Sequence, residues 1–315
     1  MSTFTSRSEN TMIRRITSCV LVGLAALVAA CAPAATSRAV AAAPSDDHPS
    51  IAVTVDDIPA HGGLAPGETR LDLSRRLVAA LTAAGVPARG FVNGSRAQAN
   101  PDATAALEYW ADAFPVGNHT WTHANLNDLT AEAFGDEIAR DEPLLKKVSR
   151  GDWHWFRYPY LQEGDDPAKR LAVRRYLASH GYRIASVTMT FDDWKYNDAY
   201  VRCAARGDQA AIAKLEEDWL DAVRYNAEAS RTLAKAAYGS DIPYVLLTHF
   251  GSFDARMFPR TLALYREMGF HFVSLEEAQN HPAYAGDDDP AAVPGPAEGL
   301  PAERVPEIDL AGLCV

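Results

Sequence analysis

The chain has 315 residues, of which 48% are hydrophobic and 23% charged, and this balance is typical of a globular protein with a sizeable core. Its formal net charge is -11, although the first 30 residues carry three arginines and only one glutamate. An acidic body argues against nucleic acid or anionic lipid as its main partner, because both repel negative charge. Neutral or cationic sugar polymers remain compatible with this charge.

Residues 1–31 have the pattern of an export signal. Two arginines precede the apolar run Cys19–Ala30, which is too short to span a membrane comfortably, and small residues lead to Cys31. This end resembles the lipobox of bacterial lipoproteins, in which the cysteine is lipidated. An ordinary signal peptide cleaved near Ala35 or Ala43 is the alternative. We expect an exported lipoprotein, periplasmic or at the cell surface, anchored through Cys31 and placed in an outer membrane.

Two segments have the composition of linkers or tails. Residues 32–49 are rich in Ala, Ser and Pro, which is typical of a flexible tether. Residues 282–315 turn to Asp, Pro, Ala and Gly, and we expect this tail to be poorly packed. Export permits a disulfide between Cys203 and Cys314, but two cysteines leave both a bond and free thiols open.

Between these segments, strand and helix patterns alternate. Short apolar runs predict strands over Ile51–Val55, Ala88–Val92, Pro115–Asn118, Trp153–Phe156, Ile184–Met189, Tyr244–Thr248 and Phe270–Ser274. Apolar spacing and capping residues predict helices over Leu71–Ala84, 100–114, 130–148, 166–181 and 258–268, and a short one after Ser274. The alternation predicts an α/β fold with a mostly parallel sheet. Residues 197–238 interrupt it as a charged, Ala-rich helical insertion or lengthened crossover.

Titratable residues follow the ends of successive predicted strands. The ends of parallel strands meet at one rim of an α/β fold, so we expect these side chains to converge. For the adjacent Asp56 and Asp57, a solvated turn is the plain alternative, since Asp is an ordinary turn residue. The residues concerned are Asp56, Asp57, His119, His123, Arg157, Asp193 and His249.

These segments resemble the motifs of the polysaccharide deacetylases, the NodB-homology or carbohydrate esterase family 4 enzymes. Thr54–Asp57 is similar to the motif TFDD, with Val in place of Phe. Residues 190–194 match only the end of DxxDW, because Thr190 stands where an Asp is expected. The motifs H[ST]xxH, RxPY and LxxH are matched at 119–123, 157–160 and 246–249, so that the resemblance covers about residues 50–280.

The resemblance implies a distorted, incomplete (β/α) barrel of about seven parallel strands, with its site at the C-terminal rim. Residues 50–281 would form this catalytic domain. The resemblance also implies a zinc ion, or another divalent metal such as Co²⁺ or Mn²⁺, held by Asp57, His119 and His123. The spacing of the two histidines would place both rings on one side of a helical turn.

Four further roles follow from the resemblance. Asp56 would be the base that takes a proton from water, and Arg157 would orient it and keep it ionised. His249 would be the acid that protonates the leaving amine. Asp193 would hold His249 in its tautomer, although Asp192 could substitute for it because the fourth motif is imperfect.

The remaining predicted site residues would surround the substrate. The backbone N–H of Tyr160 would complete the oxyanion site. Trp194 and Leu246 would line the acetyl pocket, with plain core residues as the alternative. His61 follows the first strand and could touch substrate.

The resemblance therefore predicts a metal-dependent hydrolase that removes N-acetyl groups from N-acetylhexosamine units of a cell-envelope or extracellular polysaccharide. An acetylated glycan would be its partner, and we expect a monomer. One alternative is an O-acetyl ester hydrolase acting on xylan-like glycans. The other is a non-catalytic glycan-binding lipoprotein, for which the imperfect fourth motif is the only support.

Overall fold

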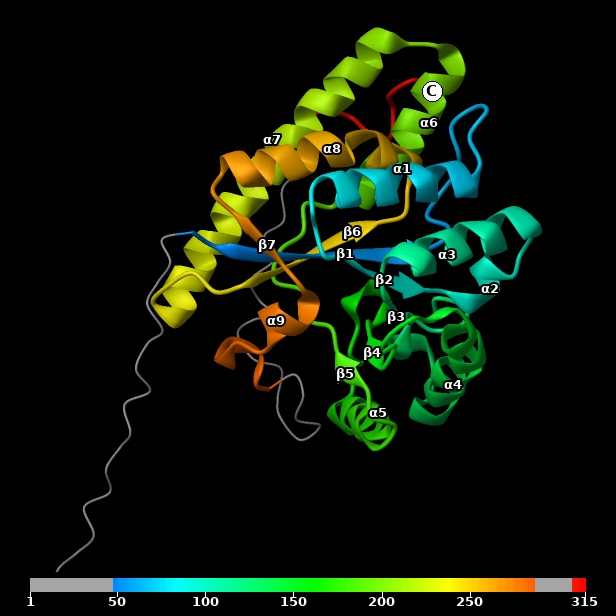
Figure 1. The fold of residues 1–315 in the computed structure, drawn as a ribbon, viewed down its shortest axis with the longest axis vertical. Coiled ribbons are helices and arrows are strands. Elements are labelled where there is room, and N and C mark those ends of the chain that lie inside the picture. The colour runs from blue at the N-terminus through cyan, green and yellow to red at the C-terminus, as the bar shows by residue number, and fades with distance from the viewer. Residues whose placement is uncertain (1–47, 287–307) are drawn as a thin grey trace, which may run out of the picture. The chain divides into compact units, whose positions relative to one another are not determined.

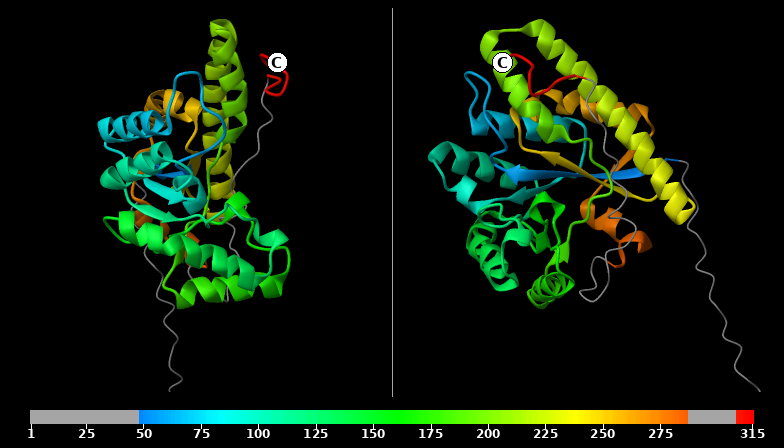
Figure 2. Two further views of the ribbon diagram at one scale, coloured as in Figure 1. Left: turned by 90° about the vertical axis from the view of Figure 1, so that its right-hand side faces the viewer. Right: turned by 180° about the vertical axis from the view of Figure 1, so that it is seen from behind.

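Seven parallel strands form the sheet at the centre of this computed structural model, which describes residues 48–286 and 308–315 (Figure 1). The sheet order is β5-β4-β3-β2-β1-β6, and β7 pairs with the first residues of β1. The sheet curls into an incomplete barrel with helices around it (Figure 2), which confirms the predicted fold. The strands are β1 Ser50–Ile58, β2 Arg89–Val92, β3 Val116–Asn118, β4 Trp155–Phe156, β5 Arg183–Ile184, β6 Tyr244–His249 and β7 His271–Val273.

Strand β1 is the organising element of the sheet. Eight of its nine residues are buried, as expected for an apolar strand covered on both faces. It pairs with β2, β6 and β7, and the register of β1 with β6 places Asp56 opposite His249. Two of the predicted site residues are thus neighbours across one strand pair.

Strand β5 is shorter than the predicted strand Ile184–Met189. Only Arg183–Ile184 pairs with β4, and the chain then crosses toward β6. There Met189 forms an isolated bridge with Leu246, and its amide donates to the carbonyl of Val245. The barrel is incomplete because residues 185–187 span this gap without a continuous ladder.

The predicted starts of four helices are confirmed, and in each case a polar side chain caps the first turn. Asn100, Thr130, Asp166 and Ser274 each accept a hydrogen bond from a backbone amide of the helix that follows. The helices are α1 Arg70–Ala83, α2 Gly94–Ala97, α3 Pro101–Ala113, α4 Ala131–Val148, α5 Pro167–Ser179, α6 Asn197–Arg206, α7 Gln209–Tyr238, α8 Ser252–Glu267 and α9 Leu275–Gln279.

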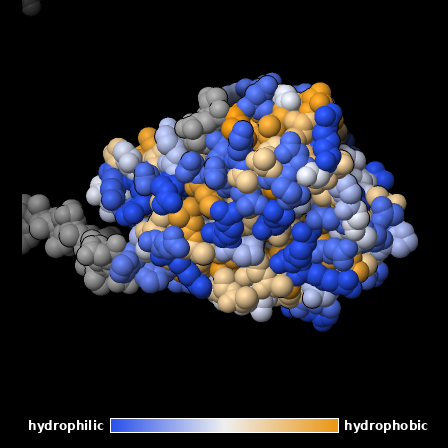
Figure 3. All heavy atoms as spheres, turned by 90° about the horizontal axis from the view of Figure 1, so that it is seen from above, coloured by the Kyte–Doolittle hydropathy of each residue, from blue (hydrophilic) through white to orange (hydrophobic). Residues whose placement is uncertain are grey.

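The predicted insertion is a pair of helices, α6 and α7, separated at Gly207. The left-handed φ of 68° at Gly207 ends α6. Leu215, Trp219 and Val223 form a buried stripe on α7, and the indole of Trp219 donates to Thr261 of α8 at 2.8 Å. Helix α7 therefore packs beside α8 in the same core (Figure 1). The face seen from above carries mostly hydrophilic residues with separate hydrophobic areas (Figure 3), as amphipathic helices produce.

The segment 308–315 is fixed to α6, contrary to the expectation of poor packing. Cys314 forms a disulfide with Cys203, which settles the question that the sequence left open. The guanidinium of Arg202 donates to three carbonyls of the segment, and Leu310 and Leu313 pack against the core. At the start of the predicted tail, Tyr284 is fully buried. The disulfide at Cys314 and the burial of Tyr284 thus order segments whose composition predicts poor packing.

The predicted signal, the lipobox with Cys31, and nearly all of the predicted tether lie outside the described residues. Within residues 48–286 and 308–315, no helix combines the length and the hydropathy that a membrane span requires.

Candidate active site

The C-terminal end of β1 is distorted where the two aspartates lie. The pairing of β1 with β2 shifts register between Val55 and Ile58, and Asp57 has a left-handed φ of 62°. A bulge breaks the regular alternation of side chains along a strand. As a result, both Asp56 and Asp57 line one cavity, and both carboxylates lie near Nε2 of His119, at 3.7 and 3.8 Å.

Asp57 lies beside the two histidines of the second motif. Its Oδ1 is 3.3 Å from Nε2 of His123 and 3.8 Å from Nε2 of His119. One potential ligand atom from each of the three side chains lies within 4.8 Å of the others. The structure therefore brings together the three residues predicted to share a metal ion.

These histidines lie in a loop, so the prediction of a helical turn is wrong. Thr120 and His123 have left-handed φ values of 64° and 62°. The side-chain amide of Asn93 donates to the carbonyls of His119 and Thr120, at 2.6 and 3.2 Å, and Asn118 accepts from the amide of Thr120. Contacts from neighbouring strand ends, rather than helical periodicity, hold the two rings on the same side.

The donor set fits a divalent cation. His119 has its Nδ1 2.8 Å from the carbonyl of Arg157, which leaves Nε2 directed at Asp57. Nδ1 of His123 is buried without a hydrogen-bond partner, and Oδ1 of Asp57 faces the Nε2 atoms of both histidines as well as the guanidinium of Arg96. Two imidazoles and one carboxylate are a usual ligand set for zinc and similar ions, and they leave coordination positions for water and substrate.

The protonation states suit the same cation. Burial lowers the pKa of His119 well below its usual value and that of His123 to about 4, so both rings are neutral. Burial alone would raise the pKa of Asp57, but the hydrogen bond with His61 and the charge of Arg96 hold it well below its usual range. Neutral imidazoles and an ionised carboxylate bind metal without first losing a proton.

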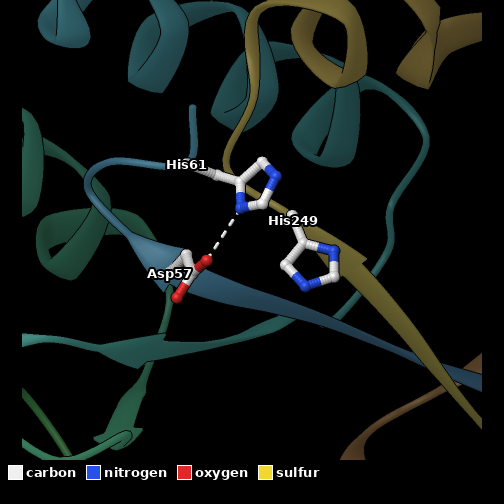
Figure 4. Close-up of side chains that lie close together, drawn as sticks. All are labelled: Asp57, His61 and His249. Atoms are coloured by element: carbon white, nitrogen blue, oxygen red, sulfur yellow. Dashed lines mark hydrogen bonds and ion pairs between the residues drawn. The ribbon is translucent and has the colours of Figure 1, made fainter. Parts of the chain in front are cut away.

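His61 is a further neighbour of Asp57. Its Nδ1 lies 2.8 Å from Oδ2 of Asp57, and its ring centroid is 4.7 Å from that of His249 (Figure 4). Asp57, His61 and His249 are also close enough to share one ion. The sequence placed His61 only as a residue that could touch substrate. The structure shows that His61 holds Oδ2 of Asp57, while Oδ1 faces His119, His123 and Arg96.

Asp56 is paired with Arg157 in the interior. Nη1 of Arg157 lies 3.3 and 3.2 Å from the two Asp56 oxygens, while Nη2 and Nε donate to Thr54 and Ala185. Burial raises the pKa of Asp56 to about 6, although the charge of Arg157 opposes this rise. A fixed carboxylate that titrates near neutrality suits the acceptance of a proton.

His249 is held by Asp193. The backbone amide of His249 donates to Oδ2 of Asp193 at 2.6 Å, and Nδ1 lies 3.0 Å from Oδ1. Burial lowers the pKa of His249, but the charge and hydrogen bond of Asp193 outweigh this and raise it to about 9. Asp192, the alternative partner, instead pairs with Lys195 at 2.6 Å. The Thr190 substitution in the fourth motif therefore leaves the imidazole–carboxylate pair intact.

Two ionisable residues of the site were not predicted from the sequence. Arg96 of α2 has Nη1 2.8 Å from Oδ1 of Asp57, and α2 itself was not predicted because it has only four residues. Asp254, in the first turn of α8, is fully buried. Burial and the charge of Asp193 raise the pKa of Asp254 well above its usual range, so it is the protonated member of this carboxyl pair. No sequence motif marks either residue.

The cavity above these residues has a volume of about 470 Å³. Tyr160 and Trp194 line it with side chains that are 61% and 47% exposed. Leu246, predicted to line the acetyl pocket, is instead buried in the core, and Leu247 lines the cavity. Successive side chains of a strand point to opposite faces, which explains the exchange.

A family model for polysaccharide deacetylases matches residues 43–185, which include three of the five motifs. Over this region the chain is similar to the polysaccharide deacetylases. Among curated proteins, the chain is similar to a chitin deacetylase from Pestalotiopsis sp, with 26% identity over 165 residues. That match covers 52% of this chain and 50% of the relative, so the chain spans about half of the relative's length.

Solved structures show the same fold. One is the chitin deacetylase from Colletotrichum lindemuthianum, with a TM-score of 0.50, 19% identity, and coverage of 73% of this chain and 87% of that chain. Another is a carbohydrate esterase family 4 pseudoenzyme from Bacillus anthracis, with a TM-score of 0.52, 17% identity, and coverage of 74% and 66%. A mutant of the pseudoenzyme with restored activity scores 0.52 at 18% identity and covers 74% and 68%. The fold alone therefore does not establish activity.

Gly94 tests how the loop between the two histidines is held. A Cβ at Gly94 would overlap Asp141 and Trp121, and Trp121 lies between His119 and His123 in the chain. We expect Gly94→Ala to lower the free energy of unfolding by about 1–3 kcal/mol through overpacking, and to weaken metal binding.

Denaturant unfolding and a metal titration measure these two effects of Gly94→Ala. The matched control is Gly151→Ala, because a Cβ at Gly151 meets no atom within 4 Å. A Gly94→Ala protein with unchanged stability and unchanged metal affinity would contradict the prediction.

Proposed function

We propose that this protein removes N-acetyl groups from N-acetylhexosamine units of a cell-envelope or extracellular polysaccharide. Asp57, His119 and His123 would hold a divalent ion, with zinc the best match to the donor set. The observation that carries the proposal is the placement of Asp56 and His249 beside these three ligands, at one cavity. One group accepts a proton there and the other donates one.

Asp56 would act first, as the general base. When bound, the ion supplies positive charge that polarises the acetyl carbonyl and makes water more acidic. Asp56 accepts the proton of the attacking water, while Arg157 fixes the direction of its carboxylate. The backbone N–H of Tyr160, at the edge of the same cavity, donates to the carbonyl oxygen as negative charge develops on it.

His249 would complete the reaction as the general acid. A pKa of about 9 keeps its imidazole protonated at neutral pH, so Nε2 carries a proton for the amine nitrogen. As the C–N bond breaks, the amine receives this proton and acetate leaves with the oxygen of the water. Asp193 keeps the ring oriented throughout, because it binds both Nδ1 and the backbone amide of His249.

Acetate release from a small glycan panel tests the proposal. We expect release from N-acetylglucosamine oligomers, loss of release after chelation, and recovery when zinc, cobalt or manganese is added. Metal analysis of the purified protein identifies the ion that it holds. Full activity in a metal-free preparation would overturn the mechanism. Release from acetylated xylan alone would favour the ester hydrolase, and glycan binding without turnover across these metals would favour the non-catalytic alternative.

We also propose that the protein is exported and anchored through Cys31. The support is the residue pattern of 1–31, with its paired arginines, apolar run and small residues before the cysteine. Cell fractionation tests this proposal: the protein should be found with membranes, and Cys31→Ala should move it to the soluble fraction.

A further inference from the structure

A second hollow adjoins the active-site cavity. It has a volume of about 560 Å³ and lies between the start of α6 and the segment 308–315. We call it the 308–311 groove, because residues 308–311 form one of its walls. The opposite wall consists of Trp194, Lys195, Asp198 and Arg202. Trp194 also lines the active-site cavity, so the two hollows meet at one side chain.

The wall formed by residues 308–311 is held to α6 by a disulfide and by hydrogen bonds. Cys314 is bonded to Cys203, the last buried residue of α6. Arg202 donates to the carbonyls of Leu310, Ala311 and Leu313 at 2.6, 3.2 and 3.1 Å. A wall fixed before the ligand arrives loses little conformational entropy on binding. The groove therefore has the character of a preorganised binding surface.

The lining combines an aromatic face with balanced charges. The Trp194 side chain is 47% exposed, and Nζ of Lys195 lies 5.4 Å from its ring centroid. Among the lining side chains, Lys195 and Arg202 are positive and Asp198 and Asp309 are negative, and Lys195 is also paired with Asp192 of the active-site cavity. An aromatic ring offers a surface for the apolar face of a sugar, while charged groups bond its hydroxyls. A balanced charge favours a neutral, N-acetylated glycan over a polyanion or a polycation.

We propose that the 308–311 groove binds further sugar units of the same polysaccharide, beyond Trp194 from the unit that loses its acetyl group. The proposal rests on the proposed function, because the occupant is the rest of the substrate chain. Every residue of the groove follows residue 185, where the family match ends. The groove is therefore built from parts of the chain that lie outside the matched region.

Substrates of different length distinguish the contribution of the groove from that of the catalytic residues. We compare acetate release from N-acetylglucosamine trimers and hexamers by the wild type, by Asp198→Ala, and by the double variant Cys203→Ser, Cys314→Ser. In both variants kcat/KM for the hexamer should fall about tenfold, which corresponds to about 1.4 kcal/mol of binding free energy. The trimer value should stay within about twofold of wild type. Circular dichroism and thermal unfolding verify that each variant is folded.

The matched control is Arg256→Gln. It breaks the ion pair with Glu216 between α8 and α7, at 2.6 Å, and neither residue lines the groove. This variant should leave the kcat/KM values of both oligomers unchanged.

Calorimetric titration with the hexamer makes the groove testable without turnover. Weaker hexamer binding by Asp198→Ala than by wild type supports the groove, even where no acetate is released and the proposed function fails. Equal hexamer binding and equal hexamer turnover in the wild type and both variants would refute the proposal that the groove binds sugar units. Acetate release by the wild type would still support the proposed function in that case.

Discussion

Asp57→Asn should abolish both metal binding and acetate release. Asp57 supplies the one carboxylate of the Asp-His-His group, and its Oδ1 lies 3.3 Å from Nε2 of His123 and 3.8 Å from Nε2 of His119. Asparagine keeps the shape but removes the negative charge that attracts a cation and that pairs with Arg96 at 2.8 Å. Since a catalytic metal ion contributes several kcal/mol to the stabilisation of a transition state, the proposed mechanism predicts that kcat/KM falls by about 10³-fold or more.

Metal content by mass spectrometry and acetate release measure the effect of Asp57→Asn. The matched control is Asp165→Asn, which removes a carboxylate from an exposed pair with Lys169 and should change neither quantity. Retention of one tightly held metal ion per chain by Asp57→Asn would show that the ligand set is wrong. Retention of activity without metal would show that the proposed mechanism is wrong.

Much of the fold follows from local signals in the sequence. Asn100, Thr130, Asp166 and Ser274 cap helices where their side chains predicted, because a cap involves only neighbouring residues. The apolar run of β1 is central and buried because both of its faces are covered. The prediction that titratable side chains gather at the strand ends also follows from a general property of parallel sheets, which have all these ends at one edge.

The details of the site depend on contacts that a sequence does not display. The spacing of His119 and His123 suggested a helix, but Asn93 on a neighbouring strand end holds the two carbonyls that shape the loop. Asp57 points into the cavity because of a bulge against β2. The exchange of Leu246 for Leu247 depends on which face of β6 meets the cavity, and this is fixed by the sheet register.

The prediction from composition was wrong where one contact between distant residues determines the packing of a segment. The segment 308–315 resembles a tail in its Ala and Gly content, yet the bond from Cys314 to Cys203 joins residues 111 positions apart. Asp254 likewise depends on a contact between residues far apart in the chain, because it is buried next to Asp193. Its protonated carboxyl places an uncharged group, rather than a second negative charge, beside the pair that holds His249.

The pair of His249 and Asp193 gives the second prediction with a large expected effect on activity. Asp193→Asn should reduce activity at neutral pH by about 10²- to 10⁴-fold, the range expected when a general acid is lost. Burial lowers the pKa of His249, and the charge and hydrogen bond of Asp193 raise it to about 9. Without that charge the burial effect prevails, so His249 loses its proton at a lower pH and is neutral when the amine must leave.

The pH profile of kcat/KM distinguishes this role from a purely structural one. His249 is the acid in its protonated form, so wild-type activity should fall as the pH rises through about 9. In Asp193→Asn this alkaline limb should move to lower pH, whereas a merely destabilised protein would lose activity at every pH alike. Asp192→Asn is the matched control, because Asp192 pairs with Lys195. An alkaline limb that stays in place in Asp193→Asn would show that His249 is not the group that protonates the amine.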